Sequence, residues 1–332
     1  MKNSTLRWAV LGTGRFVTTV AIPAMKQCQQ AQVTGIASRS AQAAESAAEQ
    51  LGLPKSYASY EAALQDPEVD VIYNALPNHL HVEWSIRAMR AGKHVLCEKP
   101  ISLTLEGCRR LMEARDQARV LIGEAFMIRH HRQWARALEL AESEAGQIRN
   151  VVGIFSYDNR NPANIRNQAD CGGGALWDIG CYLVLVSRMA FRSEPIRVYA
   201  AMDVDPQFGV DRLTSAVLTF ASGHSVFSCG TQMAPFQNVQ LIGTKGRVEV
   251  EIPFNAPVDG PCSLIVQRDG LPKGVFETET FRVNQYAAQA DEFSSAVLGY
   301  GQPLTTLEDS ARTVRAIEAL FESARSGVPV SV

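Results

Sequence analysis

The stretch Trp8-Ala9-Val10-Leu11-Gly12-Thr13-Gly14-Arg15-Phe16-Val17 places a glycine-rich turn directly after a short apolar run. An apolar run followed by such a turn predicts a buried strand that leads into a helix. In this context glycines let the backbone approach a pyrophosphate, whose charge the amino end of the helix favours. We therefore expect a dinucleotide site here and assign five residues to it: Gly12, Thr13, Gly14, Arg15 and Phe16.

The chain around this turn alternates short apolar runs with helical patterns. Further strands are expected at residues 33–37, 69–73, 94–97 and 120–122, and helices at 41–51, 81–91 and 104–117. This alternation is typical of repeated βαβ units, which build a doubly wound parallel sheet with helices on both faces. We expect this α/β dinucleotide-binding domain to span residues 1–123.

The rest of the chain has a different period. Apolar and polar residues alternate at 151–157, 196–202, 215–220, 224–229, 239–242 and 247–252, whereas helical patterns return at 284–298 and 306–325. Alternation with a period of two predicts strands with one buried face. We expect a second α/β domain over residues 124–332, with an open, mostly antiparallel sheet.

Composition excludes several classes of protein. The 332 residues are 46% hydrophobic and 20% charged, and 32 basic residues face 34 acidic ones, for a net charge of −2. A balanced charge gives no general attraction to nucleic acid or to a membrane surface, and we expect neither as a partner. The seven cysteines are an odd number without a Cys-x-x-Cys pair, so we expect no disulfide framework and a cytoplasmic location.

The end of the second expected strand indicates which dinucleotide binds. Its sequence Ala37-Ser38-Arg39-Ser40 holds no acidic residue, although NAD-selective loops usually place one there for the ribose 2′-hydroxyl. The planar guanidinium of Arg39 can instead pair with a 2′-phosphate, and Ser38 can add a hydrogen bond. We expect NADP as the cofactor, with NAD less favoured.

Two more strand ends carry polar residues that can line the same edge of the sheet. Leu76-Pro77-Asn78-His79-Leu80-His81 opens a helix, and Cys97-Glu98-Lys99-Pro100 ends a strand. We expect Leu76, Pro77, Asn78, His81, Glu98 and Lys99 to contact the cofactor, with Lys99 near its nicotinamide. The two histidines lack a third ligand at suitable spacing, so we expect no metal.

Asp178 and Tyr182 follow the glycine run at residues 172–174. Four residues apart on a helix, the two side chains share one face. An alternative interpretation is a flexible loop followed by a buried helix with Tyr182 in the core. The pattern alone leaves both interpretations open.

Taken together, these motifs resemble the Gfo/Idh/MocA oxidoreductases in both order and spacing. The motifs are Gly12-Thr13-Gly14, Pro77 to His81, Gly92-Lys93-His94-Val95, Glu98-Lys99-Pro100, and Gly172 to Tyr182. The resemblance implies a Rossmann domain followed by an α/β domain whose open sheet face commonly mediates homo-oligomerisation. Tyr182 replaces the histidine of many relatives, which favours the branch containing glucose-fructose oxidoreductase, NADP-dependent xylose dehydrogenases and dihydrodiol dehydrogenases. His131 and Arg166 lie in segments that point to the same branch.

The resemblance implies a function and roles for the residues. We expect hydride transfer between the nicotinamide and a hydroxyl-bearing carbon of an aldose or a related polyhydroxylated substrate. Tyr182 transfers the hydroxyl proton, Lys99 stabilises its phenolate, and Asp178, Arg166 and His131 bind or orient polar groups. A nucleotide-sugar ketoreductase and a trans-dihydrodiol dehydrogenase are alternatives. A regulator that senses dinucleotides without turnover is an alternative from another class.

Overall fold

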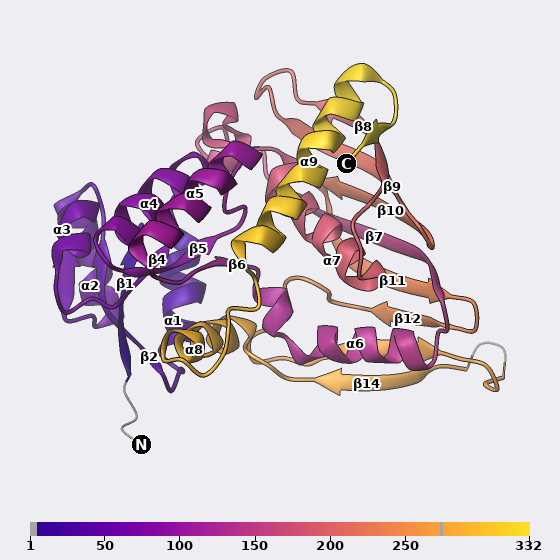
Figure 1. The fold of residues 1–332 in the computed structure, drawn as a ribbon, viewed down its shortest axis with the longest axis horizontal. Helices are drawn as coiled ribbons and strands as arrows, with labels where there is room; N and C mark the ends of the chain where they lie inside the picture. Colours follow the sequence, from indigo (N-terminus) through magenta and orange to yellow (C-terminus); the bar gives the residue numbers. More distant parts are fainter. Residues whose placement is uncertain (1–4, 273–274) are drawn as a thin grey trace. The chain divides into compact units, whose positions relative to one another are not determined.

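The computed structural model describes residues 5–272 and 275–332. The chain divides into two compact units (Figure 1). Unit 1 consists of Met1–His130 and Asn284–Ala311, and unit 2 consists of His131–Val283 and Arg312–Val332. We expected one uninterrupted second domain after residue 123. The inclusion of Asn284–Ala311 in unit 1 is a feature that the sequence patterns did not indicate.

Unit 1 contains a six-stranded parallel sheet with the strand order β3-β2-β1-β4-β5-β6 (Figure 1). The strands are β1 (Leu6–Leu11), β2 (Ala31–Ala37), β3 (Lys55–Tyr57), β4 (Val71–Asn74), β5 (His94–Glu98) and β6 (Ile122–Ala125). The chain moves outward from β1 to β3 and then returns to the other side of β1 at β4. Such a reversal of strand order opens a crevice at the carboxyl ends of the strands. The parallel sheet is therefore confirmed.

The strand expected at residues 120–122 is displaced. β6 begins at Ile122, where pairing with Val95 of β5 starts, so most of the expected strand lies in the preceding loop. Strand β3 was not predicted, because three residues are too few to show a period.

The helices of unit 1 have recognisable ends. They are α1 (Ile22–Met25), α2 (Ala41–Leu51), α3 (Tyr60–Gln65), α4 (His81–Arg90), α5 (Leu105–Ala118) and α8 (Gln285–Val297). The side chains of Ser40, Ser59 and Thr104 cap α2, α3 and α5 by accepting backbone N–H groups. Gly52 ends α2 in the left-handed conformation, as its position after Leu51 predicted.

Unit 2 contains a nine-stranded sheet with the order β14-β13-β12-β11-β7-β10-β9-β8-β15. The strands are β7 (Ile148–Asp158), β8 (Arg197–Val204), β9 (Asp211–Phe220), β10 (Gly223–Gly230), β11 (Gln232–Gly243), β12 (Arg247–Val250), β13 (Cys262–Gln267), β14 (Glu277–Phe281) and β15 (Val330–Ser331). Its central strand β7 pairs antiparallel with β11 and parallel with β10. The sheet is therefore mixed, and mostly antiparallel as expected.

Helices α6 (Arg132–Ser143) and α7 (Cys181–Phe191) pack on one face of this sheet (Figure 1). The longest helix, α9 (Leu307–Ser326), begins in unit 1 and continues in unit 2. The helical segment Ala169–Phe191 is long and apolar enough to cross a membrane, but 83% of its apolar window is buried inside the protein. Such burial is what a core helix shows, so the segment is weak evidence for a membrane span.

Candidate functional site

The glycine turn after β1 has the geometry that a bound phosphate requires. Gly12 has a φ of +103°, and a Cβ atom there would lie 3.1 Å from the Ala75 carbonyl oxygen. A Cβ atom on Gly14 would meet nothing within 4 Å, so the space beside it is open. Helical geometry begins at Arg15, and its first backbone N–H groups point away from the helix. An open space at a helix amino end fits a pyrophosphate.

The side chains of the turn differ in exposure. Arg15 is exposed, whereas the ring of Phe16 packs edge-on against that of Tyr286 with centroids 5.5 Å apart. Thr13 is half-buried. The backbone of this turn is therefore the part best placed to hold phosphate oxygens, and cofactor contacts by the three side chains remain predictions.

Arg39 lies just beyond the carboxyl end of β2 and is exposed. Within residues 5–272 and 275–332, no carboxylate forms an ion pair with its guanidinium. Beside it, Ser38 is buried, and its hydroxyl oxygen accepts the Ser40 N–H at 3.2 Å. The guanidinium does interact with the Tyr60 hydroxyl, a neutral partner. A guanidinium without a carboxylate partner, at the end of the strand beside β1, fits a 2′-phosphate, and no acidic side chain follows β2 to repel one.

The loop after β4 contains Leu76, Pro77 and Asn78, and a 3-10 turn begins at Asn78. The His81 ring beneath this loop is buried, with Nδ1 2.8 Å from the Pro100 carbonyl oxygen and Nε2 2.6 Å from that of Leu76. Burial lowers the pKa of His81 to about 4. The ring therefore connects the loop after β4 to the loop after β5, and direct contact with a cofactor remains a prediction.

The loop after β5 carries Lys99, and its Lys99–Pro100 peptide bond is cis. The Lys99 N–H donates to Glu98 Oε2 at 3.3 Å, and the Tyr73 hydroxyl donates to Glu98 Oε1. The next N–H group, that of Ile101, donates to Glu124 Oε1 at 2.8 Å. All the residues assigned to the cofactor from the sequence therefore lie at the carboxyl edge of the unit 1 sheet.

Asp178 in unit 2 receives two hydrogen bonds on one oxygen. Its Oδ2 accepts the Tyr157 hydroxyl at 2.6 Å and Arg166 Nε at 3.0 Å, and its side chain is buried. The charge of Asp178, opposed by burial, raises the pKa of Arg166 above its usual range, and a charge on Tyr182 acts in the same direction. The structure thus brings Asp178 and Arg166 together, with Tyr157 as a third member.

Tyr182 is the second residue of α7, and only 4% of the residue is exposed. It is the neighbour of two other aromatic rings, with centroids 6.0 Å from Phe155 and 5.4 Å from Phe254. Phe155 and Phe254 also stack on each other at 4.6 Å. These contacts fix the ring plane. The core interpretation of Tyr182 is therefore compatible with its surroundings, and a proton-transfer role remains a proposal.

His131 has a structural position in unit 2. It is the amino-terminal cap of α6, where Nδ1 accepts the Gln133 N–H at 3.1 Å, and it is buried. Its Nε2 lies 3.7 Å from Cys262 Sγ, and burial lowers the pKa of His131 to about 4. Capping accounts for this residue, and contact with a substrate remains a prediction.

Sequence reasoning missed Tyr157, Phe155 and Phe254. Phe155 and Tyr157 lie in the strand expected at 151–157, where alternate residues share one face. That alternation signals burial and gives no partner for the Tyr157 hydroxyl. Phe254 follows β12, outside any pattern that marks a site.

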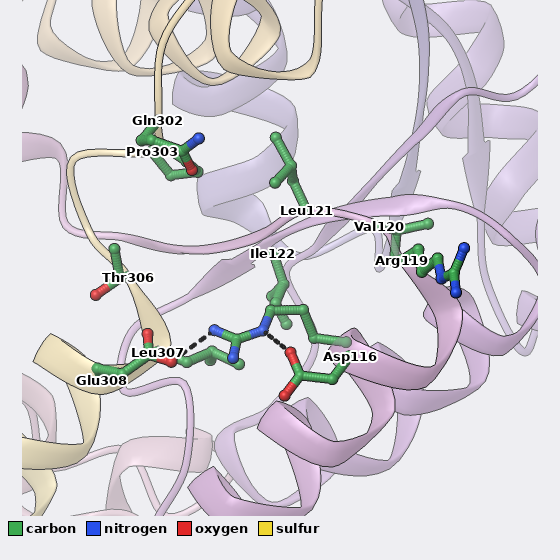
Figure 2. Close-up of a pocket in the computed structure, with 11 residues that line it drawn as sticks. Asp116, Arg119, Val120, Leu121, Ile122, Gln302, Pro303, Thr306, Leu307 and Glu308 are labelled. Carbon is green, nitrogen blue, oxygen red and sulfur yellow. Dashed lines mark hydrogen bonds and ion pairs between the residues drawn. The ribbon is translucent and has the colours of Figure 1, made fainter. Parts of the chain in front are cut away.

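A separate pocket of about 490 Å³ lies elsewhere in unit 1 (Figure 2). Its lining includes Arg115, Asp116 and Glu308, where the Arg115 guanidinium donates to both carboxylates at 2.8 Å. The pocket also touches residues 119–122, at the amino end of β6. It therefore lies at the opposite edge of the sheet from the glycine turn and contains no residue assigned from the sequence.

Two models of one oxidoreductase family match most of this chain. The model of the GFO/IDH/MocA oxidoreductase family, with an NAD-binding Rossmann fold, matches residues 6–126, and the GFO/IDH/MocA C-terminal domain matches residues 132–249. A D-xylose 1-dehydrogenase (NADP(+)) from Haloferax volcanii is 35% identical over 98% of this chain and 100% of that protein.

Two solved structures resemble the whole chain. The aldose-aldose oxidoreductase from Caulobacter crescentus, complexed with glycerol, has a TM-score of 0.89 at 28% identity and covers 99% of this chain and 100% of its own. A 3-ketoreductase from Actinomadura kijaniata, in complex with NADP and TDP-benzene, has a TM-score of 0.88 at 29% identity over 96% and 98% of the two chains.

Proposed function

This chain belongs to the GFO/IDH/MocA family of oxidoreductases, and we propose that it oxidises a hydroxyl-bearing carbon of an aldose with NADP. The observation that carries the proposal is the carboxyl edge of the unit 1 sheet. There the glycine turn, Arg39 and Lys99 follow the carboxyl ends of β1, β2 and β5 of one parallel sheet. The named activities of the xylose dehydrogenase and the aldose-aldose oxidoreductase support an aldose as the substrate.

In this proposal, different residues of unit 1 bind different parts of NADP. When bound, NADP supplies a nicotinamide that accepts or donates a hydride. The backbone at Gly12 to Phe16 holds the pyrophosphate, and Arg39 with Ser38 holds the 2′-phosphate. Leu76 to Asn78 after β4, Glu98 at the end of β5 and Lys99 after it hold the remainder of the dinucleotide.

In this proposal, Tyr182 accepts the proton of the substrate hydroxyl. A tyrosine with an ordinary pKa near 10 is a poor base at neutral pH, so its phenolate needs a cation nearby. Lys99 supplies that ammonium in the proposal. Asp178, held by Tyr157 and Arg166, accepts a second substrate hydroxyl and thereby orients the carbon that loses the hydride.

The test measures NADPH formation by absorbance with a panel of pentoses, hexoses, keto sugars and diols, with NADP and with NAD. We expect turnover with an aldose and a lower KM for NADP than for NAD. Tyr182→Phe and Lys99→Ala should each lower kcat by about 10²- to 10⁴-fold, since each removes part of the proton-transfer pair. Tyr300→Phe, at an exposed tyrosine, is the matched control and should keep full activity.

Two results would contradict the assignment. Near-full hydride transfer by both variants would remove the proposed proton-transfer pair, and NADP binding without turnover of any sugar would favour a sensing regulator. Reduction of a nucleotide-linked keto sugar in preference to aldose oxidation would favour the second candidate, a nucleotide-sugar ketoreductase. The 3-ketoreductase structure supports that candidate.

We also propose a homo-oligomer that forms through the open face of the unit 2 sheet. Tyr199 pairs with Val217, Val217 with Val226 and Val226 with Val152, so these four side chains form one row across β8, β9, β10 and β7. Each is 37–41% exposed. An apolar row of this kind favours burial against a partner.

We also propose that the protein is located in the cytoplasm. Its seven cysteines are all free, and free thiols are typical of that reducing compartment.

A further inference from the structure

We propose that Tyr157 is a positioning residue that holds the Asp178 carboxylate in place for a substrate hydroxyl. The inference rests on the proposed function and adds to it a residue that neither the sequence motifs nor the family comparison identifies. Its basis is the meeting of three separate segments at one carboxylate oxygen, Asp178 Oδ2: two segments supply donors and the third carries Asp178. The segments are β7, the 3-10 turn Ile165–Asn167 and the helical turn Leu176–Gly180.

The hydrogen bond from Tyr157 is short and has a fixed donor. The hydroxyl lies 2.6 Å from Asp178 Oδ2, a length typical of an O–H group bound to an ionised carboxylate. Burial and the charge of Asp178 raise the pKa of the Tyr157 phenol far above its usual range. The phenol therefore stays protonated and donates throughout the neutral range.

Tyr157 holds Asp178 from a more rigid element than Arg166 does. Strand β7 is the central strand of the nine-stranded sheet; next to Tyr157, Ser156 is paired with both β10 and β11, and Asp158 is paired with β11. Arg166 lies on a turn of three residues, and its side chain is 42% exposed. Groups on paired strands keep their positions better than groups on loops, so β7 sets the position of the carboxylate.

The same strand positions Tyr182 as well. Alternate residues of β7 face the helical segment: Gly153 lies against Leu183, Phe155 against the Tyr182 ring, and Tyr157 against Asp178. Phe155 and Tyr157, two residues apart on one strand, therefore contact Tyr182 and Asp178 at the same time, so one strand holds both groups.

The test is Tyr157→Phe, which keeps the ring and removes the hydroxyl. We expect about a tenfold lower kcat/KM for the sugar, mainly through a higher KM for the sugar, with an unchanged KM for NADP. A purely structural role would change the KM for NADP as well as the KM for the sugar. Tyr300→Phe is the matched control.

A double-mutant cycle with Asp178→Asn tests whether Tyr157 acts through the carboxylate. Once Asp178 is neutral, adding Tyr157→Phe should change kcat/KM by less than twofold. An equal loss in both backgrounds would overturn the inference, as would full sugar activity of Tyr157→Phe alone.

The inference and the proposed function can fail separately. If the wild type oxidises no compound in the panel, the proposed function is contradicted. The same double-mutant cycle is then evaluated from the urea unfolding midpoints of the four proteins. If the shifts caused by Tyr157→Phe and Asp178→Asn are additive, the inference is overturned. Non-additive midpoints would support the hydrogen bond independently of the substrate.

Discussion

Glu124 is a carboxyl group enclosed by unit 1, with only 3% of the residue exposed. Burial raises its pKa to about 7, partly opposed by hydrogen bonds that include the one from the Ile101 N–H. Below about pH 4.5 the group is protonated in both the folded and the unfolded chain. Between pH 4.5 and 7 only the folded chain keeps the proton, so the stability that Glu124 contributes falls as pH rises.

The change Glu124→Gln removes this titration and keeps an acceptor for Ile101. A shift from 4.5 to about 7 corresponds to roughly 3 kcal/mol, at about 1.4 kcal/mol per pKa unit. We therefore expect the free energy of unfolding of the wild type, relative to the variant, to fall by about this amount between pH 4.5 and 7.5. Urea unfolding at several pH values measures it. Parallel curves for the two proteins would contradict the prediction.

Helix α8 contributes to the core of unit 1, although it lies far from the strands of that unit in the sequence. Its residue Phe293 is buried and packs edge-on against Trp8 of β1, with ring centroids 5.8 Å apart. A Cβ atom on Gly123 of β6 would lie 3.2 Å from the same phenyl ring. The helix therefore completes the core of unit 1, although more than 150 residues separate it from β6.

Phe293→Ala should destabilise unit 1 by about 3–5 kcal/mol, because it removes a buried ring and leaves a cavity against Trp8. Val297→Ala, one turn later and only half-buried, should cost about 1 kcal/mol or less. Urea unfolding followed by tryptophan fluorescence measures both. Equal costs would show that α8 does not pack on this sheet as described.

The same helix shows how far sequence patterns reach. The spacing of Ala290 and Phe293 predicted a helix with one apolar face, and both residues are buried. The pattern could not say which sheet that face covers, because an apolar stripe carries no information about its partner. Tyr157 is the equivalent case in the candidate site: its strand was predictable, whereas its bond to Asp178 depends on the path of three segments.

At the scale of the whole molecule, the two units gather residues of different kinds. Unit 1 holds every residue assigned to the cofactor, on strand ends that the glycine turn and the βαβ alternation predicted. Unit 2 holds His131, Arg166, Asp178 and Tyr182, which only the family resemblance assigned to a substrate. A parallel sheet brings strand ends to one edge by its topology, and this is why the first set was predictable from local patterns. The loops of a mixed sheet follow no comparable rule.

The open sheet face sets the expected assembly of the molecule. Val226 lies in the middle of the row, paired with Val217 on one side and Val152 on the other. Val226→Lys should disrupt a homo-oligomer, because burying an unpaired ammonium in an apolar interface costs several kcal/mol. The fold should be retained, since the side chain points to solvent within the chain. Light scattering after size exclusion should give a multiple of the chain mass for the wild type and for the exposed control Tyr300→Lys, and one chain mass for Val226→Lys. A monomeric wild type, or an oligomer that survives Val226→Lys, would contradict oligomerisation through this face.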